Sequence, residues 1–257
     1  MHLNKPNRQA AFTKIEMSVV IVCAALLVVF VIMPRIAKAT TRAARVSCIS
    51  NLKNIGLAFR IFATDNDGRF PWQPSPSNQP ASPALLFSEA PGTPLAPAAG
   101  VARWFSVLSN ELSTPRCLRC PSDPFRLTPQ SNTFAFLMAP AQAAARDRAA
   151  SYFIGLNANE EQPQSILGGD RNIAGPPFSL SPTEAPSQVA LRIPFGVATN
   201  QTAFASANWT AEIHQNAGNL LFGDGSVQQV ASPAMRGALL NAALAGTNDL
   251  DFLWPAN

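Results

Sequence analysis

Residues 12–33 read FTKIEMSVVIVCAALLVVFVIM, and this stretch decides how the rest of the chain is organised. After Glu16 the next charged side chain is Arg35. A helix over residues 12–33 rises by 1.5 Å per residue and is about 33 Å long, which is enough to cross a bilayer. A carboxylate at the mouth of such a span is costly and needs a partner. The stretch therefore predicts a transmembrane helix whose single acid binds a partner.

This span differs from a cleaved secretory signal. Such a signal has an apolar region of about 7–15 residues, followed by a small-residue cleavage site. Here we expect cleavage ahead of the apolar run rather than behind Met33. The span then stays attached to the mature chain.

The order Phe-Thr-Lys-Ile-Glu at residues 12–16 resembles the N-terminus of type IV pilins and type II secretion pseudopilins. Their pattern is Gly followed by Phe-Thr-Leu-Ile-Glu. Ala11 stands here in place of the Gly, and Lys14 in place of the Leu. The resemblance implies a single-pass protein of the bacterial inner membrane with its head in the periplasm.

The same resemblance implies how the chain is processed and assembled. Residues 1–11 would be a leader peptide that a prepilin peptidase removes between Ala11 and Phe12, and the new amine of Phe12 would be methylated. Glu16 would pair with that amine on a neighbouring subunit when the helices pack in a filament. The implied partners are the prepilin peptidase, the inner membrane, and copies of this chain or other pilin-like subunits.

Composition agrees with an anchored, loop-rich protein. The chain has 257 residues, of which 47% are hydrophobic and only 13% charged, with 23 prolines and 14 glycines, so much of it should be loop. The net charge of +4 comes largely from the first quarter, at Lys5, Arg8, Lys14, Arg35, Lys38, Arg42, Arg45 and Lys53. That distribution fits the flanks of a membrane segment better than a nucleic-acid surface, so we expect no nucleic-acid partner.

The helical pattern continues beyond Pro34. Apolar residues recur at spacings of 4, 3, 4 and 3, which places them on one helix face: Cys48, Leu52, Ile55, Phe59 and Phe62. The sequence Asp-Asn-Asp-Gly at residues 65–68 marks the stop. We therefore predict one long helix over residues 12–64, transmembrane over 12–33, and a head over residues 65–257. The alternative is an anchor and a separate domain helix, divided at Pro34.

The head should be α+β, with the long helix packed on a small antiparallel sheet in a pilin-like arrangement. The sequence pattern predicts a long surface excursion over 73–100, a short amphipathic helix over 103–112, and strands near 151–154, 166–173 and 188–193. The strongest local prediction is a hairpin of residues 219–223 and 226–230 around a type I′ turn at Asp224-Gly225. A closing helix then begins with Ser232 as N-cap and Pro233 as its first residue, and runs to about Leu244.

A second resemblance covers most of the head. His214 precedes Asp224-Gly225 with nine residues between them, similar to the H-X9-DG processing-associated domain of many prepilin-like proteins. Further pieces in the same order look similar to that group: Cys48 with residues 51–57, residues 65–71, Cys120 to Asp123, Ser151-Tyr152, and Gly169 to Asn172. The resemblance supports membership of a prepilin-like family.

Three interpretations of His214 and Asp224 remain open. They approach each other across the hairpin base, or they belong to a metal site with Asp170 or Asp123, or Asp224 and Gly225 make the turn while His214 packs locally. We favour the last. The chain has only two histidines, one of them in the leader, and no Gly-x-Ser-x-Gly elbow or Gly-rich phosphate loop. We therefore predict no catalytic residue, no cofactor and no metal.

The four cysteines have separate roles. Cys23 lies inside the span. Cys117 and Cys120 have the spacing of half a zinc site, but no second pair follows. In an oxidising compartment Cys120 would form a disulfide with either Cys48 or Cys117, and sequence does not choose between them.

These observations predict a structural subunit of a type II secretion pseudopilus or a type IV pilus-like filament. The alternative from another class is a membrane-anchored exported enzyme, such as a metal-dependent hydrolase that uses His214 and Asp224. A third possibility is a minor pseudopilin that binds a secreted cargo through residues 73–100.

Overall fold

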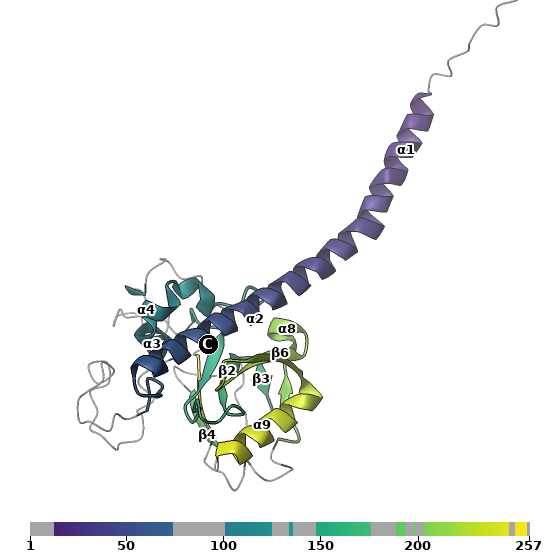
Figure 1. The fold of residues 1–257 in the computed structure, drawn as a ribbon. Helices are drawn as coiled ribbons and strands as arrows, with labels where there is room; N and C mark the ends of the chain where they lie inside the picture. The colour runs from purple at the N-terminus through teal and green to yellow at the C-terminus, as the bar shows by residue number, and fades with distance from the viewer. Residues whose placement is uncertain are drawn as a thin grey trace, which may run out of the picture. The chain divides into compact units, whose positions relative to one another are not determined.

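The computed structural model describes residues 13–73, 101–124, 134–135, 148–175, 189–193, 198, 202, 204–246 and 250–255 (Figure 1). The predicted leader, the cleavage site between Ala11 and Phe12, and almost all of the predicted excursion over 73–100 lie outside these residues. The chain forms two compact units, residues 1–43 and residues 44–257. It combines an N-terminal apolar helix with a mixed α+β head built on an antiparallel sheet.

Helical structure is unbroken from Lys14 to Asp65. Helix α1 covers Lys14–Leu27, the π-helix η1 covers Val28–Ile32, and α2 covers Met33–Asp65. The amide of Met33 donates to the carbonyl of Val28, five residues back, instead of four. This wider turn lies directly before Pro34, which has no amide hydrogen to donate, and such turns are common where the regular ladder is interrupted.

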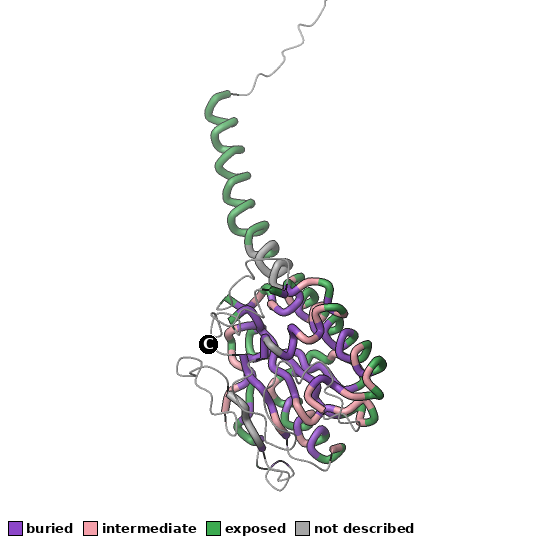
Figure 2. The backbone as a smooth tube through the Cα atoms, turned by 90° about the vertical axis from the view of Figure 1, so that its left-hand side faces the viewer, coloured by how far each residue is buried: buried purple, intermediate pink, exposed green. Residues whose placement is uncertain are grey.

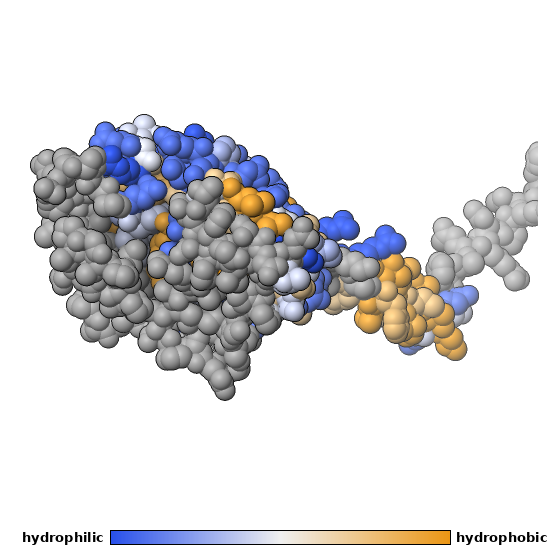
Figure 3. Space-filling view, turned by 90° about the horizontal axis from the view of Figure 1, so that it is seen from below, coloured by the Kyte–Doolittle hydropathy of each residue, from blue (hydrophilic) through white to orange (hydrophobic). Residues whose placement is uncertain are grey.

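The first part of this helical run is apolar and exposed. Residues Lys14–Ile32 have a mean hydropathy of 2.9, and every residue of α1 and η1 is exposed (Figure 2). Figure 3 shows apolar side chains gathered on this segment in orange. Its 19 residues rise about 28 Å, close to the thickness of a bilayer core. By length and composition this helix could cross a membrane.

The unit of residues 44–257, which we call the head from here on, includes the second part of α2. This part of the helix is amphipathic, as predicted. Of the expected stripe, Cys48, Leu52, Ile55 and Phe59 are at most 1% exposed, and Phe62 is half-buried. The helix ends where the Asp-Asn-Asp-Gly sequence predicts. The amide of Gly68 donates to the carbonyl of Ala63 at 2.7 Å, and the positive φ of Gly68, 77°, suits a residue without a Cβ.

The head is built on a six-stranded antiparallel sheet in the order β4-β8-β1-β2-β6-β7. The strands are β1 (Tyr152–Gly155), β2 (Ile166–Asp170), β4 (Val189–Ile193), β6 (Ala217–Phe222), β7 (Val227–Ala231) and β8 (Leu250–Trp254). Two short strands, β3 (Ile173–Ala174) and β5 (Asn208–Trp209), pair separately. The expected strands near 151–154, 166–173 and 188–193 are therefore present.

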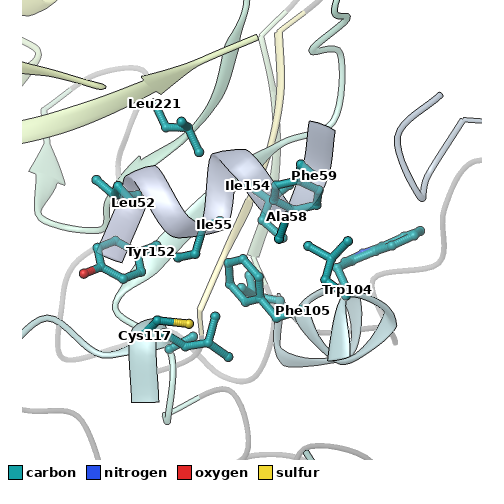
Figure 4. Packing of buried hydrophobic residues seen from close by; sticks show 14 of the residues in the cluster. Leu52, Ile55, Ala58, Phe59, Trp104, Phe105, Cys117, Tyr152, Ile154 and Leu221 are labelled. Carbon is teal, nitrogen blue, oxygen red and sulfur yellow. The ribbon is translucent and has the colours of Figure 1, made fainter. Parts of the chain in front are cut away.

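Helices cover both faces of this sheet. In β1, Tyr152 and Ile154 belong to the apolar cluster that contains the α2 stripe, whereas Phe153 belongs to the cluster that contains α9 (Ser232–Gly246). This alternation follows from the two-residue period of a strand. Figure 4 shows the first cluster, with side chains of α2, β1, β6 and α3 in contact around Ile55. Because both faces of β1 are buried, its sequence does not alternate between polar and apolar residues. Its aromatic and β-branched residues indicate a strand instead.

The prediction of one helix over 103–112 is wrong in detail. The structure has two helices there, α3 (Val101–Val107) and α4 (Ser109–Leu112). They are separated at Leu108, whose amide bonds to Phe105, three residues back, and so tightens the last turn of α3. The four predicted apolar side chains are nevertheless buried: Trp104, Phe105, Leu108 and Leu112.

The hairpin loop is longer than the predicted type I′ turn. The amide of Phe222 donates to the carbonyl of Ser226, so three residues separate the paired ends. Gly225 has φ 81°, but Asp224 lacks the positive φ that type I′ needs. This is the three-residue loop in which a glycine in the left-handed region follows a turn. Asp-Gly occurs in the two-residue type I′ turn and in this three-residue loop, so the dipeptide alone does not distinguish them.

The closing helix is α9, and it begins at Ser232 itself. The hydroxyl of Ser232 accepts a hydrogen bond from the amide of Trp209 at 3.0 Å and donates to the carbonyl of Asn216 at 3.3 Å. The residue expected to cap its own helix therefore ties α9 to β5.

Candidate functional site

The head contains a buried group of polar and sulfur side chains beside α2. It is centred on His214, the last residue of the short helix α8 (Ala211–His214). Its members come from α2, from the turn after the 3₁₀ helix η3 (Pro115–Leu118), and from β2 and β6. Each of the following is at most 6% exposed: Cys48, Cys120, Asp123, Asp170, Arg171, His214 and Asn219.

A disulfide joins Cys48 of α2 to Cys120, with their Cα atoms 5.1 Å apart. Of the two pairings that the sequence left open, the structure has this one. The bond closes a loop across a sequence separation of 72 and ties α2 to the chain that follows η3. Cys23 and Cys117 are free; Cys23 is exposed and Cys117 is buried.

A buried ion pair holds the turn after Cys120. The Arg171 guanidinium donates through Nε and Nη2 to the two oxygens of Asp123, at 2.8 and 2.9 Å. Its Nη1 donates to Glu212 at 3.2 Å. The forked geometry satisfies both Asp123 oxygens, which a fully buried carboxylate requires. This pair locks the turn to the end of β2.

Asp170 is the last residue of β2 and is completely buried. Its Oδ2 accepts from the backbone amide and from the side-chain amide of Asn219 on β6, at 2.7 and 2.8 Å. Within the described part of the chain its Oδ1 has no hydrogen-bond partner. Burial raises the pKa of Asp170 to about 7, although the Asn219 bonds oppose the shift.

His214 Nε2 lies between two other groups of the cluster. It is 3.4 Å from Asp170 Oδ2 and 3.5 Å from Cys120 Sγ. The His214 carbonyl accepts from Arg45 Nη2 at 2.8 Å. Burial lowers the pKa of His214 to about 4, and the positive charge of Arg45 adds to the shift. The imidazole is therefore neutral near pH 7.

The structure keeps His214 away from Asp224. Strand β6 runs between them, and its six residues alone span about 17 Å. Asp224 is exposed in the hairpin loop, where its Oδ1 accepts from the Ser226 amide at 2.8 Å and its carbonyl accepts from Arg60. The approach of His214 to Asp224 across the hairpin base is thus wrong. Asp224 and Gly225 form the loop, and His214 packs in the core.

The sequence indicates Asp123 and Asp170 as possible companions of His214, but it does not indicate Arg171 or Asn219. Arg171 follows Asp170 directly and lies inside a segment that the prepilin-like resemblance includes. The hairpin pattern places Asn219 only at the first position of a strand. A buried acid requires donors, so each aspartate was itself a signal that a partner existed.

A second candidate site lies at the start of α1. Thr13 is the N-cap, and its hydroxyl accepts from the Glu16 amide at 3.3 Å. Glu16 Oε2 accepts in return from the Thr13 amide at 2.8 Å and from its hydroxyl at 2.9 Å. This reciprocal arrangement is a capping box, and it fixes the carboxylate at the N-terminal end of the apolar helix.

Comparisons with protein-family models, with curated proteins and with solved structures give no match.

Proposed function

We propose that this protein is a structural subunit of a type II secretion pseudopilus or a type IV pilus-like filament. The observation that carries the proposal is the run Lys14–Ile32, apolar, exposed along its whole length, and bearing a capped carboxylate in its first turn. An exposed apolar helix of this length needs either lipid or other helices around it. In this proposal the membrane surrounds the helix with lipid before assembly, and the filament surrounds it with other helices afterwards.

The Glu16 carboxylate supports this role. Both of its hydrogen bonds use Oε2, and Oε1 has no partner among the residues that the structure describes. The acid is therefore oriented by Thr13 and still has acceptor capacity for a cation. When helices bury this end, a carboxylate without a cation would cost several kcal/mol. The methylated amine of Phe12 on a neighbouring subunit is the cation that the pilin resemblance offers.

The head's construction also suits a filament subunit. Helix α2 continues from the apolar segment and contributes its buried stripe to the head, and the disulfide joins it to the segment after η3. In this proposal a prepilin peptidase removes residues 1–11. The subunit waits in the inner membrane with its head in the periplasm, and it then assembles with its copies or with other pilin-like subunits.

The test replaces Glu16 with Ala in cells that also make a prepilin peptidase and the assembly machinery. We expect Glu16→Ala to remain in the membrane fraction and to disappear from sheared, pelletable filaments, because its helix no longer compensates the neighbour's amine. Glu160→Ala is the matched control, since it also removes one acid but acts on an exposed ion pair of the head with Arg60.

Cys23 provides an independent readout. It is the one exposed free thiol of the four cysteines, and it lies in the apolar helix. A bismaleimide should link wild-type chains into covalent dimers through Cys23 and leave Glu16→Ala monomeric. Normal filament yield and normal dimer formation from Glu16→Ala would refute the role assigned to this acid.

A further inference from the structure

We propose that the reduced head binds a zinc ion through Cys48, Cys120 and His214, with Asp170 as the fourth ligand. The metal and the disulfide then use the same two sulfurs and exclude each other. This inference concerns the head alone and does not depend on assembly into a filament.

Geometry is the first argument. The sulfurs of Cys48 and Cys120 and a ring nitrogen of His214 all lie within 4.8 Å of one another. Zn–S bonds are about 2.3 Å and Zn–N bonds about 2.05 Å, so a sulfur and a nitrogen on one tetrahedral zinc lie about 3.5 Å apart. The distance from Cys120 Sγ to His214 Nε2 is 3.5 Å.

Asp170 lies beside His214. For a nitrogen and a carboxylate oxygen on one tetrahedral zinc the separation is about 3.4 Å. His214 Nε2 lies 3.4 Å from Asp170 Oδ2. The three side chains whose ligand atoms lie within 4.8 Å of one another do not include Asp170, so this carboxylate has to move toward the two sulfurs when it binds the metal. Asp170 Oδ2 already accepts two hydrogen bonds from Asn219, whereas Oδ1 is buried and has no hydrogen-bond partner within the described residues, so Oδ1 holds the free acceptor capacity of this side chain.

The chemistry of the four groups suits zinc. Two thiolates and an imidazole are ligands that zinc prefers, and a carboxylate oxygen also binds zinc. Binding displaces one proton from each thiol, and the two sulfurs must separate to about 3.8 Å, the distance that two sulfurs keep on one zinc.

Cys117 is the competing ligand, because it has the short spacing to Cys120. The sulfur of Cys117 already donates to the carbonyl of Thr114 at 3.0 Å. His214 contacts the sulfur of Cys120, and Cys48 is bonded to that same sulfur. These contacts favour Cys48 over Cys117 as the second thiolate.

The redox step balances. A disulfide reagent accepts two electrons from the zinc-bound thiolates and two protons from water, and is thereby reduced to two thiols. The Cys48–Cys120 bond forms, and the metal leaves as Zn²⁺. The metal and the disulfide would close the same 72-residue separation between α2 and the segment after η3. Zinc would thus hold this connection in the head before oxidation does.

The experiment uses the full chain in detergent micelles with Co²⁺ as a spectroscopic probe. A trialkylphosphine reduces the disulfide, becomes the phosphine oxide with oxygen from water, and is removed without air. We expect the reduced chain to bind one equivalent of Co²⁺ with thiolate charge-transfer and tetrahedral absorption bands, and the oxidised chain to bind none. Zn²⁺ should displace Co²⁺, and oxidation of the zinc-loaded chain should release one equivalent of Zn²⁺ to a chromogenic chelator.

Variants assign the ligands. Cys48→Ala and His214→Gln should abolish the tetrahedral spectrum, and Asp170→Asn should weaken affinity by more than about tenfold. The matched controls are Cys117→Ala and Asp224→Asn, which should bind as the wild type does. Tryptophan fluorescence checks that each variant folds. Equal binding by the oxidised and reduced wild-type chains would overturn the site, as would a spectrum that depends on Cys117 instead of Cys48. Unchanged affinity in Asp170→Asn would overturn the fourth ligand.

Discussion

Removing the Cys48–Cys120 disulfide should cost the head a large part of its stability. The bond closes a loop across a separation of 72 residues. In the chain-entropy relation, a loop of that length removes about 15 cal/mol/K from the unfolded chain, which is about 4.4 kcal/mol at 25 °C. A domain of this size is stable by about 5–15 kcal/mol, so the double variant Cys48→Ala/Cys120→Ala should lose at least about a third of its free energy of unfolding.

The assay is urea unfolding of the full chain in detergent micelles, followed by tryptophan fluorescence. Trp104 and Trp209 are each 2% exposed and report the two apolar clusters of the head. Cys117→Ala is the control, since it removes a buried sulfur without opening a loop and should cost about 1 kcal/mol. If the double variant lost less than about 1.5 kcal/mol more than this control, the loop-closure reasoning would be wrong.

Two further predictions concern the buried charges. Asp123→Asn should destabilise the head by about 3–5 kcal/mol, because it leaves the Arg171 guanidinium buried beside a neutral group. Glu212→Gln, at a partly exposed partner of Arg171, should cost about 1 kcal/mol or less in the same urea assay. The second prediction is a change in pH dependence. His214 has a pKa of about 4 in the fold against an ordinary 6.5, so the stability it contributes is lost as pH falls between these values. Asp170 has a pKa of about 7 against an ordinary 3.8, so its contribution is lost as pH rises through that window. The free energy of unfolding therefore changes with pH in opposite directions for His214 and Asp170, and Asp170→Asn removes the contribution of Asp170. The variant should therefore lose up to about 1.4 kcal/mol per pH unit more than the wild type on acidification from about pH 6.5 to about 4.5. Parallel urea curves for the two proteins at both pH values would contradict the assignment.

Local and periodic features of the fold could be predicted from the sequence. The α2 stripe is visible because a helix with one buried face repeats its apolar residues every three or four positions. Its end is visible because the glycine of Asp-Asn-Asp-Gly suits the left-handed cap. The break at Leu108 escaped prediction, since all four apolar side chains of 103–112 are buried on either side of it.

The candidate site was harder to predict because its contacts are non-local. The order of the chain suggested a pair of His214 and Asp224, yet the straight strand between them holds them apart. Asp170 reaches His214 instead because β2 and β6 are neighbours in the sheet. Only the pairing of these strands reveals that contact, and spacing along the chain does not encode it. Which cysteine forms the disulfide with Cys120, Cys48 or Cys117, likewise depends on the three-dimensional packing of the head.

The most direct test of the filament proposal is the N-terminal peptide of the mature chain, identified by mass spectrometry after purification from native membranes. We predict a peptide that begins at Phe12 and carries one added methyl group on its amine. A chain that retains Met1 to Ala11 would contradict the proposal, because Glu16 would then have no amine of Phe12 to bind. A chain cleaved beyond Met33 would also contradict it, because that chain would lack both Glu16 and the apolar helix.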